Sequence, residues 1–251
     1  VYNRSHLPDS IVVDGATDRP RDILDGLGVG RVRVFALENP GSASARNAAA
    51  EKARGRYLVI LDADDVSWPD RVERLVEGFR EDPELGALGS YARLIDPEGR
   101  HLGVLRVPTD DEVISEQMRD RMAFCHATVM IRADIFRELG GYDTTYPTAE
   151  DYQLLLRIAR NYRVGNLPVV LYDIRMHGGN KSFYLFEQQQ FRGLAACHLA
   201  NKPGERDPED LERIEGNLDR SDLLEIGLRP AEIDSRLIGS FLNRVTLLWQ
   251  F

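Results

Sequence analysis

Residues 57–65 read Tyr-Leu-Val-Ile-Leu-Asp-Ala-Asp-Asp, and this stretch decides the fold. Its first half is aliphatic and β-branched, which is typical of a buried strand. Three acids follow within four residues and with no intervening loop, so like charges are crowded at the strand end. A divalent cation held by carboxylate oxygens would relieve that repulsion. Because α/β sheets bind ligands at the carboxyl ends of strands, the pattern predicts a phosphate or nucleotide bound through a metal.

Strand and helix patterns alternate on both sides of this stretch. A candidate capping box at Ser67 and Asp70 opens a helix pattern with apolar residues at helical spacing. The alternation predicts an α/β fold with a mostly parallel central sheet and helices on both faces. Further helices are predicted at 43–54, 134–139 and 150–160, and further strands at 10–15, 31–37, 86–95, 127–131 and 167–172.

The last part of the chain, from Phe183 onward, has a helical and amphipathic pattern. A polar, proline-containing stretch at 202–210 is typical of a linker. Residues 238–251 are strongly apolar, so they form either core or a partner-binding face, with a homodimer contact as a candidate. We therefore expect one domain over residues 1–182 and a helical C-terminal extension over residues 183–251.

Composition limits the classes of function. A net charge of −9 argues against a nucleic-acid partner, because duplex binding relies on clustered Lys and Arg. The two cysteines, Cys125 and Cys197, fit a reducing compartment rather than a disulfide framework. No apolar run is long enough to span a bilayer, and no signal-peptide pattern opens the sequence. We expect a cytoplasmic protein without a transmembrane segment.

Several short motifs follow one another in an order that resembles one enzyme family. Each motif alone is weak, but together they resemble the family 2 glycosyltransferases over residues 1–182. The motifs, in chain order, are Tyr2-Asn3-Arg4, Val12-Val13-Asp14-Gly15, Ala45-Arg46-Asn47-Ala48, Asp62-Ala63-Asp64-Asp65, Cys125-His126-Ala127-Thr128, Gly140-Gly141-Tyr142-Asp143, Glu150-Asp151-Tyr152 and Arg175-Met176-His177.

The resemblance implies a Rossmann-like fold of the A type and an inverting sugar transfer. The donor would be a nucleotide-diphosphate sugar (UDP-, GDP- or dTDP-linked), the acceptor a hydroxyl, and the cofactor Mn²⁺ or Mg²⁺. It implies Asp64 and His177 as metal ligands and Asp151 as general base. The residues that it implies for nucleotide binding are Tyr2, Asn3, Arg4, Asp14, Gly15, Arg46 and Asp62.

The chemistry accounts for these residue types. A departing nucleotide diphosphate concentrates negative charge, which a bound cation neutralises. An acceptor hydroxyl is a poor nucleophile until a carboxylate takes its proton, which is typically worth about 10²–10⁴-fold. With one base opposite the leaving group, a single in-line displacement inverts the anomeric centre.

The sequence leaves alternatives open for most of these residues. The acids at 62–65 also fit a strand-end turn with helix-capping duties. Asp151 also fits a helix cap, in a box with Thr148, and Glu150 is its rival as base or a residue that orients the acceptor. His177, followed by two glycines, also fits a solvated loop. His126 fits either an interior histidine or a substrate contact, and Trp68 and Tyr142 either stack on a sugar or pack against protein.

Two departures from the family pattern stand out. Only Ser5 to Asp9 separate the first two motifs, and five residues cannot form a helix that crosses a parallel sheet. Either the chain lacks that helix or the sequence as given omits residues there, and we favour the second. Asp14 stands alone where the family often has two acids before the glycine. Because Gly15 follows it, Asp14 also fits an ordinary turn residue.

Two other functions compete with sugar transfer. A sugar-1-phosphate nucleotidyltransferase shares the general fold but opens with a glycine-rich phosphate loop, which is not visible here. A non-catalytic module with a decayed site would not need to retain Asp62, Asp64, Asp151 and His177.

Overall fold

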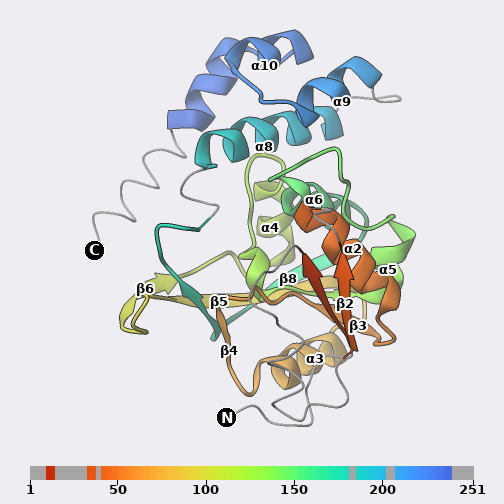
Figure 1. Cartoon of the computed structure of the whole chain (residues 1–251), viewed down its shortest axis with the longest axis vertical. Helices are drawn as coiled ribbons and strands as arrows, with labels where there is room; N and C mark the ends of the chain where they lie inside the picture. The colour runs from red at the N-terminus through yellow and green to blue at the C-terminus, as the bar shows by residue number, and fades with distance from the viewer. Residues whose placement is uncertain (1–9, 15–32, 38–40, 181–184, 202–206, 239–251) are drawn as a thin grey trace.

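A computed structural model describes residues 10–14, 33–37, 41–180, 185–201 and 207–238 (Figure 1). Of the first two segments only the backbone is described. The elements are β1 (Ser10–Asp14), β2 (Arg33–Leu37), α2 (Gly41–Lys52), β3 (Tyr57–Val59), β4 (Val66–Ser67), α3 (Arg71–Glu81), β5 (Leu85–Ile95), β6 (His101–Leu105), α4 (Asp111–Gln117), η2 (His126–Thr128), β7 (Met130–Arg132), α5 (Ala133–Glu138), α6 (Glu150–Asn161), β8 (Arg163–Arg175), α8 (Phe186–Asn201), α9 (Pro208–Glu215) and α10 (Arg220–Ile226).

A six-stranded sheet forms the centre of the described chain, in the order β3-β7-β5-β8-β4, with β6 paired to β5. Its longest ladder, β5 with β8, is parallel. The shorter pairings of β3 and β5 with β7, of β4 with β8 and of β6 with β5 are antiparallel. β1 and β2 form a separate parallel pair. The predicted α/β fold with helices around a central sheet is confirmed, and the sheet is mixed in detail.

Most elements predicted from periodicity are present, with two local exceptions. The expected capping box at Ser67 and Asp70 is wrong, because the Asp70 side chain caps no backbone N–H and accepts from Arg74 Nε instead, at 2.9 Å. The strand expected at 127–131 is also wrong in its first half, where residues 126–128 form the turn η2. There the buried Thr128 hydroxyl donates to the Cys125 carbonyl at 2.8 Å, a local bond that favours a turn over a strand.

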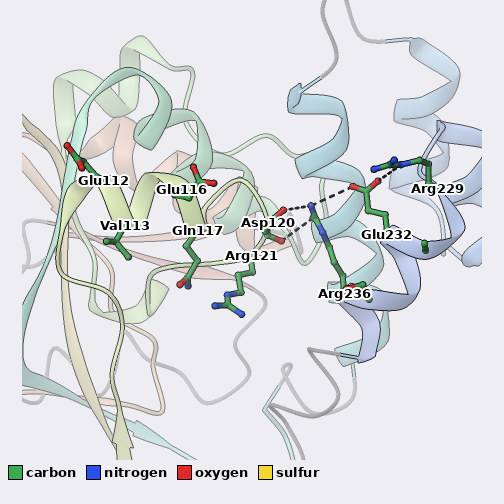
Figure 2. Close-up of a pocket in the computed structure, with 11 residues that line it drawn as sticks. Glu112, Val113, Glu116, Gln117, Asp120, Arg121, Arg229, Glu232 and Arg236 are labelled. Atoms are coloured by element: carbon green, nitrogen blue, oxygen red, sulfur yellow. Dashed lines mark hydrogen bonds and ion pairs between the residues drawn. The ribbon is translucent and has the colours of Figure 1, made fainter.

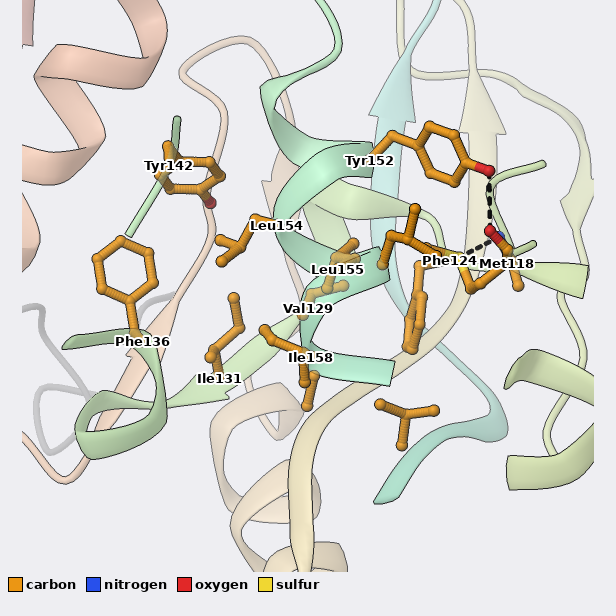
Figure 3. Close-up of a cluster of buried hydrophobic side chains, with 14 of the residues drawn as sticks. Met118, Phe124, Val129, Ile131, Phe136, Tyr142, Tyr152, Leu154, Leu155 and Ile158 are labelled. Atoms are coloured by element: carbon orange, nitrogen blue, oxygen red, sulfur yellow. Dashed lines mark hydrogen bonds between the residues drawn. The ribbon is translucent and has the colours of Figure 1, made fainter. Parts of the chain in front are cut away.

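The main core lies between the sheet and α6 (Figure 3). Leu154, Leu155 and Ile158 form the apolar stripe predicted for this helix, and all three are fully buried. They pack with Val129 and Ile131 from the strand side. The Tyr152 hydroxyl crosses to α4 and donates to the Met118 carbonyl at 2.8 Å. This packing fixes the body of α6 against the sheet.

A second hydrophobic cluster holds the C-terminal helices together. Phe191, Leu194 and Leu199 of α8 are buried in it, as their spacing predicts. The linker predicted at 202–210 ends early, because Pro208 begins α9, and residues 202–206 lie outside the described residues. Among the described helices none is both long and apolar enough to cross a bilayer.

Candidate active site

The acidic turn after β3 is tied to the end of β8. The Asp62 backbone N–H donates to the Tyr172 hydroxyl at 3.0 Å, and the Arg175 N–H donates to Asp65 Oδ1 at 2.8 Å. Arg175 Nε also donates to the Asp64 carbonyl at 3.0 Å. Residues more than 100 positions apart in the chain thus form one small structure at the sheet edge.

Asp64 and His177, the two predicted metal ligands, lie side by side. Asp64 Oδ2 is 2.8 Å from His177 Nε2, and both side chains are partly exposed, at 42% and 34%. Asn180 shapes the loop that carries His177, since its Oδ1 accepts from the His177 N–H at 2.5 Å. No described residues form a cluster of three or more metal-binding side chains. A carboxylate and an imidazole fit a divalent cation whose coordination is completed by substrate phosphate oxygens and water.

Asp65 is partly buried, and its carboxyl has a raised pKa. Burial raises the pKa of its carboxyl, the bond from the Arg175 N–H lowers it, and the charges of Asp64 and Asp62 raise it again, to about 6. Burial is therefore the main cause of the raised pKa of Asp65, and the charges of Asp64 and Asp62 add to it. The bond from the Arg175 N–H to Asp65 holds the turn against β8.

Arg46 connects the acidic turn with the start of α6. Its guanidinium contacts Asp62 Oδ1 at 3.3 Å and Glu150 Oε1 at 3.2 Å. Burial opposes the charge of Arg46, but Tyr142, Asp62 and Glu150 raise its pKa above the ordinary value. The Ser42 hydroxyl donates to the same Glu150 oxygen at 2.6 Å. Arg46 of α2 is thus held between Asp62 of the acidic turn and Glu150 of α6.

Glu150 and Asp151 occupy the first turn of α6. Glu150 is 5% exposed, and its second oxygen, Oε2, has no hydrogen-bond partner among the described residues. Asp151 Oδ1 accepts from the Tyr152 N–H at 2.7 Å, and burial raises the pKa of its carboxyl. Ala149 is the N-cap and makes no side-chain cap bond, so the capping box with Thr148 is not formed, and Asp151 instead accepts from an N–H of the first turn of its own helix.

The partly buried His126 and the buried Tyr142 form a pair beside Arg46. His126 Nε2 lies 3.0 Å from the Tyr142 hydroxyl, and the rings meet edge to face with centroids 5.9 Å apart. Burial and the charge of Arg46 lower the pKa of His126 to about 4. At neutral pH His126 is therefore uncharged, and Tyr142, at 3% exposed, packs against protein. Trp68 donates from Nε1 to Asp173 Oδ1 at 2.8 Å.

Arg71 is a part of this region that the motifs did not indicate. Its side chain is fully buried, and Nη2 donates to the carbonyls of Ile60 at 2.7 Å and Ala127 at 2.8 Å. Its guanidinium lies 4.6 Å from the centre of the Tyr172 ring. Burial lowers its pKa to about 10. The available signal was its place in the stripe with Leu75 and Phe79, where an arginine at an apolar position indicates a buried polar role.

Five predicted nucleotide-binding residues cannot be placed at side-chain level. Tyr2, Asn3, Arg4 and Gly15 lie outside the described residues. Asp14 ends β1, but its side chain is not described.

A cleft of about 1120 Å³ lies elsewhere, between α4 and the segment 229–236 (Figure 2). Asp120 and Arg236 join its two sides at 2.7 Å, and Arg236 also meets Glu232 at 3.7 Å. Its lining is mostly charged and contains none of the predicted site residues.

The solved structures that resemble this chain share its fold at low sequence identity. Staphylococcus aureus TarS 1-349 in complex with UDP-GlcNAc superposes with a TM-score of 0.62 at 16% identity, over 95% of this chain and 72% of that one. The mannosyltransferase PcManGT from Pyrobaculum calidifontis, in complex with GDP-Man and Mn²⁺, gives 0.54 at 17% identity, over 93% and 65%.

Curated relatives match only part of their own length. The chain is 27% identical to a chondroitin synthase of Pasteurella multocida, over 70% of this chain and 18% of that protein. It is 32% identical to the O-antigen biosynthesis glycosyltransferase WbnJ of Escherichia coli, over 61% of this chain and 59% of the relative. A family profile described as "Glycosyl transferase family 2" matches residues 10–140, which is more than half of the sequence. This chain therefore belongs to glycosyl transferase family 2.

Proposed function

We propose that this chain transfers a sugar from a nucleotide-diphosphate sugar to an acceptor hydroxyl, with a divalent cation and with inversion. The observation that carries the proposal is the contact between Asp64 and His177. Asp64, in the turn after β3, has Oδ2 2.8 Å from His177 Nε2, and Asp62 of the same turn contacts Arg46. The similarity to proteins solved with UDP-GlcNAc, and with GDP-Man and Mn²⁺, supports a nucleotide sugar and a metal. We also propose that residues 1–182 form the catalytic domain and that residues 183–251 contact the acceptor or a second copy.

Each predicted site residue whose side chain the structure describes has a role in this proposal. Asp64 and His177 hold the cation, whose positive charge stabilises the departing diphosphate. Asp62 faces the ribose, and Arg46 adds positive charge to the same pocket. Asp151 accepts the proton of the acceptor hydroxyl, and its raised pKa brings it closer to the operating pH that suits a general base.

Calorimetry with UDP, GDP and dTDP, each with and without Mn²⁺, tests donor binding. We expect one of them to bind in a metal-dependent manner and Asp64→Ala to weaken that binding, because the variant loses a charged ligand. Unchanged affinity in Asp64→Ala would remove Asp64 from the metal site. No binding of any nucleotide would favour a non-catalytic module instead.

Transfer itself is tested with a panel of nucleotide sugars, scored by hydrolysis and then by transfer. Asp151→Asn should keep donor binding and lose transfer, while Glu150→Gln serves as the matched change on the neighbouring acid. Normal turnover by Asp151→Asn would move the role of base to Glu150 or another group. The anomeric configuration of the product, read by NMR, tests inversion, and a retained configuration would contradict it.

A further inference from the structure

The turn that leads into α6 contains an unusual backbone conformation. Thr148 has φ = 70°, and it is the one residue other than glycine with positive φ in the part of the chain that the structure describes. A β-branched residue in this region is a genuine outlier, and such strain costs about 1–3 kcal/mol. Thr148 stands three residues before Asp151, so its conformation sets how the chain enters the helix that carries both acids.

A buried arginine from the C-terminal extension holds this residue. Arg192 of α8 is 6% exposed, and its Nη1 donates to the Thr148 hydroxyl at 3.1 Å. Its other nitrogens donate to the carbonyls of Ile214 at 3.2 Å and Gly216 at 2.6 Å, at the end of α9. Burial lowers the pKa of Arg192, and the charge of Glu150 opposes this shift. A buried cation with three directed bonds therefore joins two helices of the extension to the strained turn.

A second contact anchors the same turn. Tyr146 is 1% exposed and belongs to the hydrophobic cluster of the C-terminal helices, together with Phe191 and Leu194. The Ala149 N–H donates to the Tyr146 carbonyl at 3.1 Å, which closes the turn from within. In Figure 1, α8 lies next to α6, and the two helices are in contact. The C-terminal helices thus hold the turn through the hydrogen bond from Arg192 to Thr148 and through the apolar packing of Tyr146.

We propose that the helical extension positions the acids of α6, with Arg192 as the positioning residue that holds Thr148 in its strained conformation. This inference rests on the proposed function, in which Asp151 is the base. Without the hydrogen bond from Arg192, Thr148 relaxes to negative φ and the first turn of α6 is reoriented. A displacement of about 1 Å at a reacting group can cost about 10²-fold in rate.

The test compares Arg192→Met with Arg213→Met. Methionine keeps most of the apolar volume of arginine but has no N–H donors. Arg213 lies in the same extension but pairs with Glu225 at the surface, at 2.9 Å. We expect Arg192→Met to lower kcat by about 10- to 100-fold with the donor KM within about twofold, and Arg213→Met to behave as wild type. Thr148→Gly should restore part of kcat to Arg192→Met, because glycine adopts positive φ without strain.

Amide hydrogen exchange gives a readout that needs no substrate. Peptides covering residues 142–152 should exchange faster in Arg192→Met, while those of α3 stay as in wild type. Thr148→Val removes only the hydroxyl that accepts from Arg192, and it should show the same faster exchange over residues 142–152. It replaces Arg192→Met in this test if Arg192→Met folds poorly. Wild-type exchange over residues 142–152 in both variants would overturn the inference. So would an equal loss of kcat, donor affinity and α3 protection, which indicates general destabilisation.

The two proposals fail in different ways. If Asp151→Asn turned over normally, the assignment of the base would fall, while the exchange data would still decide whether Arg192 holds the turn. If Asp151→Asn is inactive and Arg192→Met has wild-type kcat and exchange, sugar transfer stands and the positioning role falls.

Discussion

Replacing Asp65 by asparagine is expected to stabilise the protein near neutral pH when no divalent cation is present. Burial raises the pKa of Asp65, and with the charges of Asp64 and Asp62 the value reaches about 6, from an ordinary 3.8. Asparagine keeps an oxygen that can accept the Arg175 N–H, so the substitution removes the charge and little else.

The sign follows from proton binding. Because the pKa is higher in the folded state, folding favours the protonated carboxyl. Its stabilising contribution is complete below pH 3.8 and is lost as the pH rises through about 6. At about 1.4 kcal/mol per pH unit the difference sets an upper limit of about 3 kcal/mol. Since Asp65 is partly exposed, solvent screening reduces this to about 1 kcal/mol, or a Tm change of about 2–4 °C.

The assay is thermal unfolding by circular dichroism between pH 4 and pH 8, in EDTA. The Tm advantage of Asp65→Asn should grow from pH 4 to pH 7 and shrink again when Mn²⁺ is added, because the cation offsets the crowded charge. Asp134→Asn is the control of opposite sign, since the bond from Arg132 lowers the pKa of Asp134. A difference in Tm that is the same at pH 4 and pH 8, or a lower Tm for Asp65→Asn at pH 8, would refute the reasoning.

Three further substitutions test the packing and bonds around the site. Tyr172→Phe leaves the Asp62 N–H without its partner, so the unfolding free energy in urea should fall by about 1–3 kcal/mol, and an unchanged value would contradict the bond. Leu155→Ala should cost about 2–5 kcal/mol in the same assay, whereas the exposed Val113→Ala should stay within about 0.5 kcal/mol; equal effects would contradict the assigned core. Asn47→Asp should lower Tm, because a carboxylate keeps the acceptor for the Tyr142 N–H at 2.9 Å but places an oxygen against the Tyr142 carbonyl that Asn47 Nδ2 now contacts at 2.8 Å; an unchanged Tm would count against this orientation.

Periodicity predicted the elements that bury one continuous apolar face. Helix α6 is the clearest case, because Leu154, Leu155 and Ile158 recur at helical spacing and all meet the sheet. It failed where a local side-chain bond competes with the ladder, as at Thr128. The short antiparallel pairings were also beyond reach, because strands of two or three residues carry too little pattern to show their partners.

The proximity of the candidate site residues was predictable where chemistry is concentrated in short motifs, and their roles stay predictions. Asp64 with His177 and Arg46 with Asp62 lie together in the structure, as expected of residues assigned to one pocket. The supporting residues were not predictable. Arg71 and Arg192 carry no motif, and their importance comes from burial and from carbonyl partners distant in the chain. A single sequence shows neither property.

The burial of Tyr146 among the C-terminal helices also bears on the order in which parts of the protein fold during synthesis. A ribosome delivers residues 142–152 before α8 and α9, and domains generally form as their residues emerge. Until the extension arrives, Tyr146 lacks its apolar surroundings and Thr148 lacks Arg192. The sheet and α6 can assemble during that interval, because their core is made from earlier residues. The arrangement of residues 142–152 seen in the structure can therefore be completed only after α8 and α9 have been made.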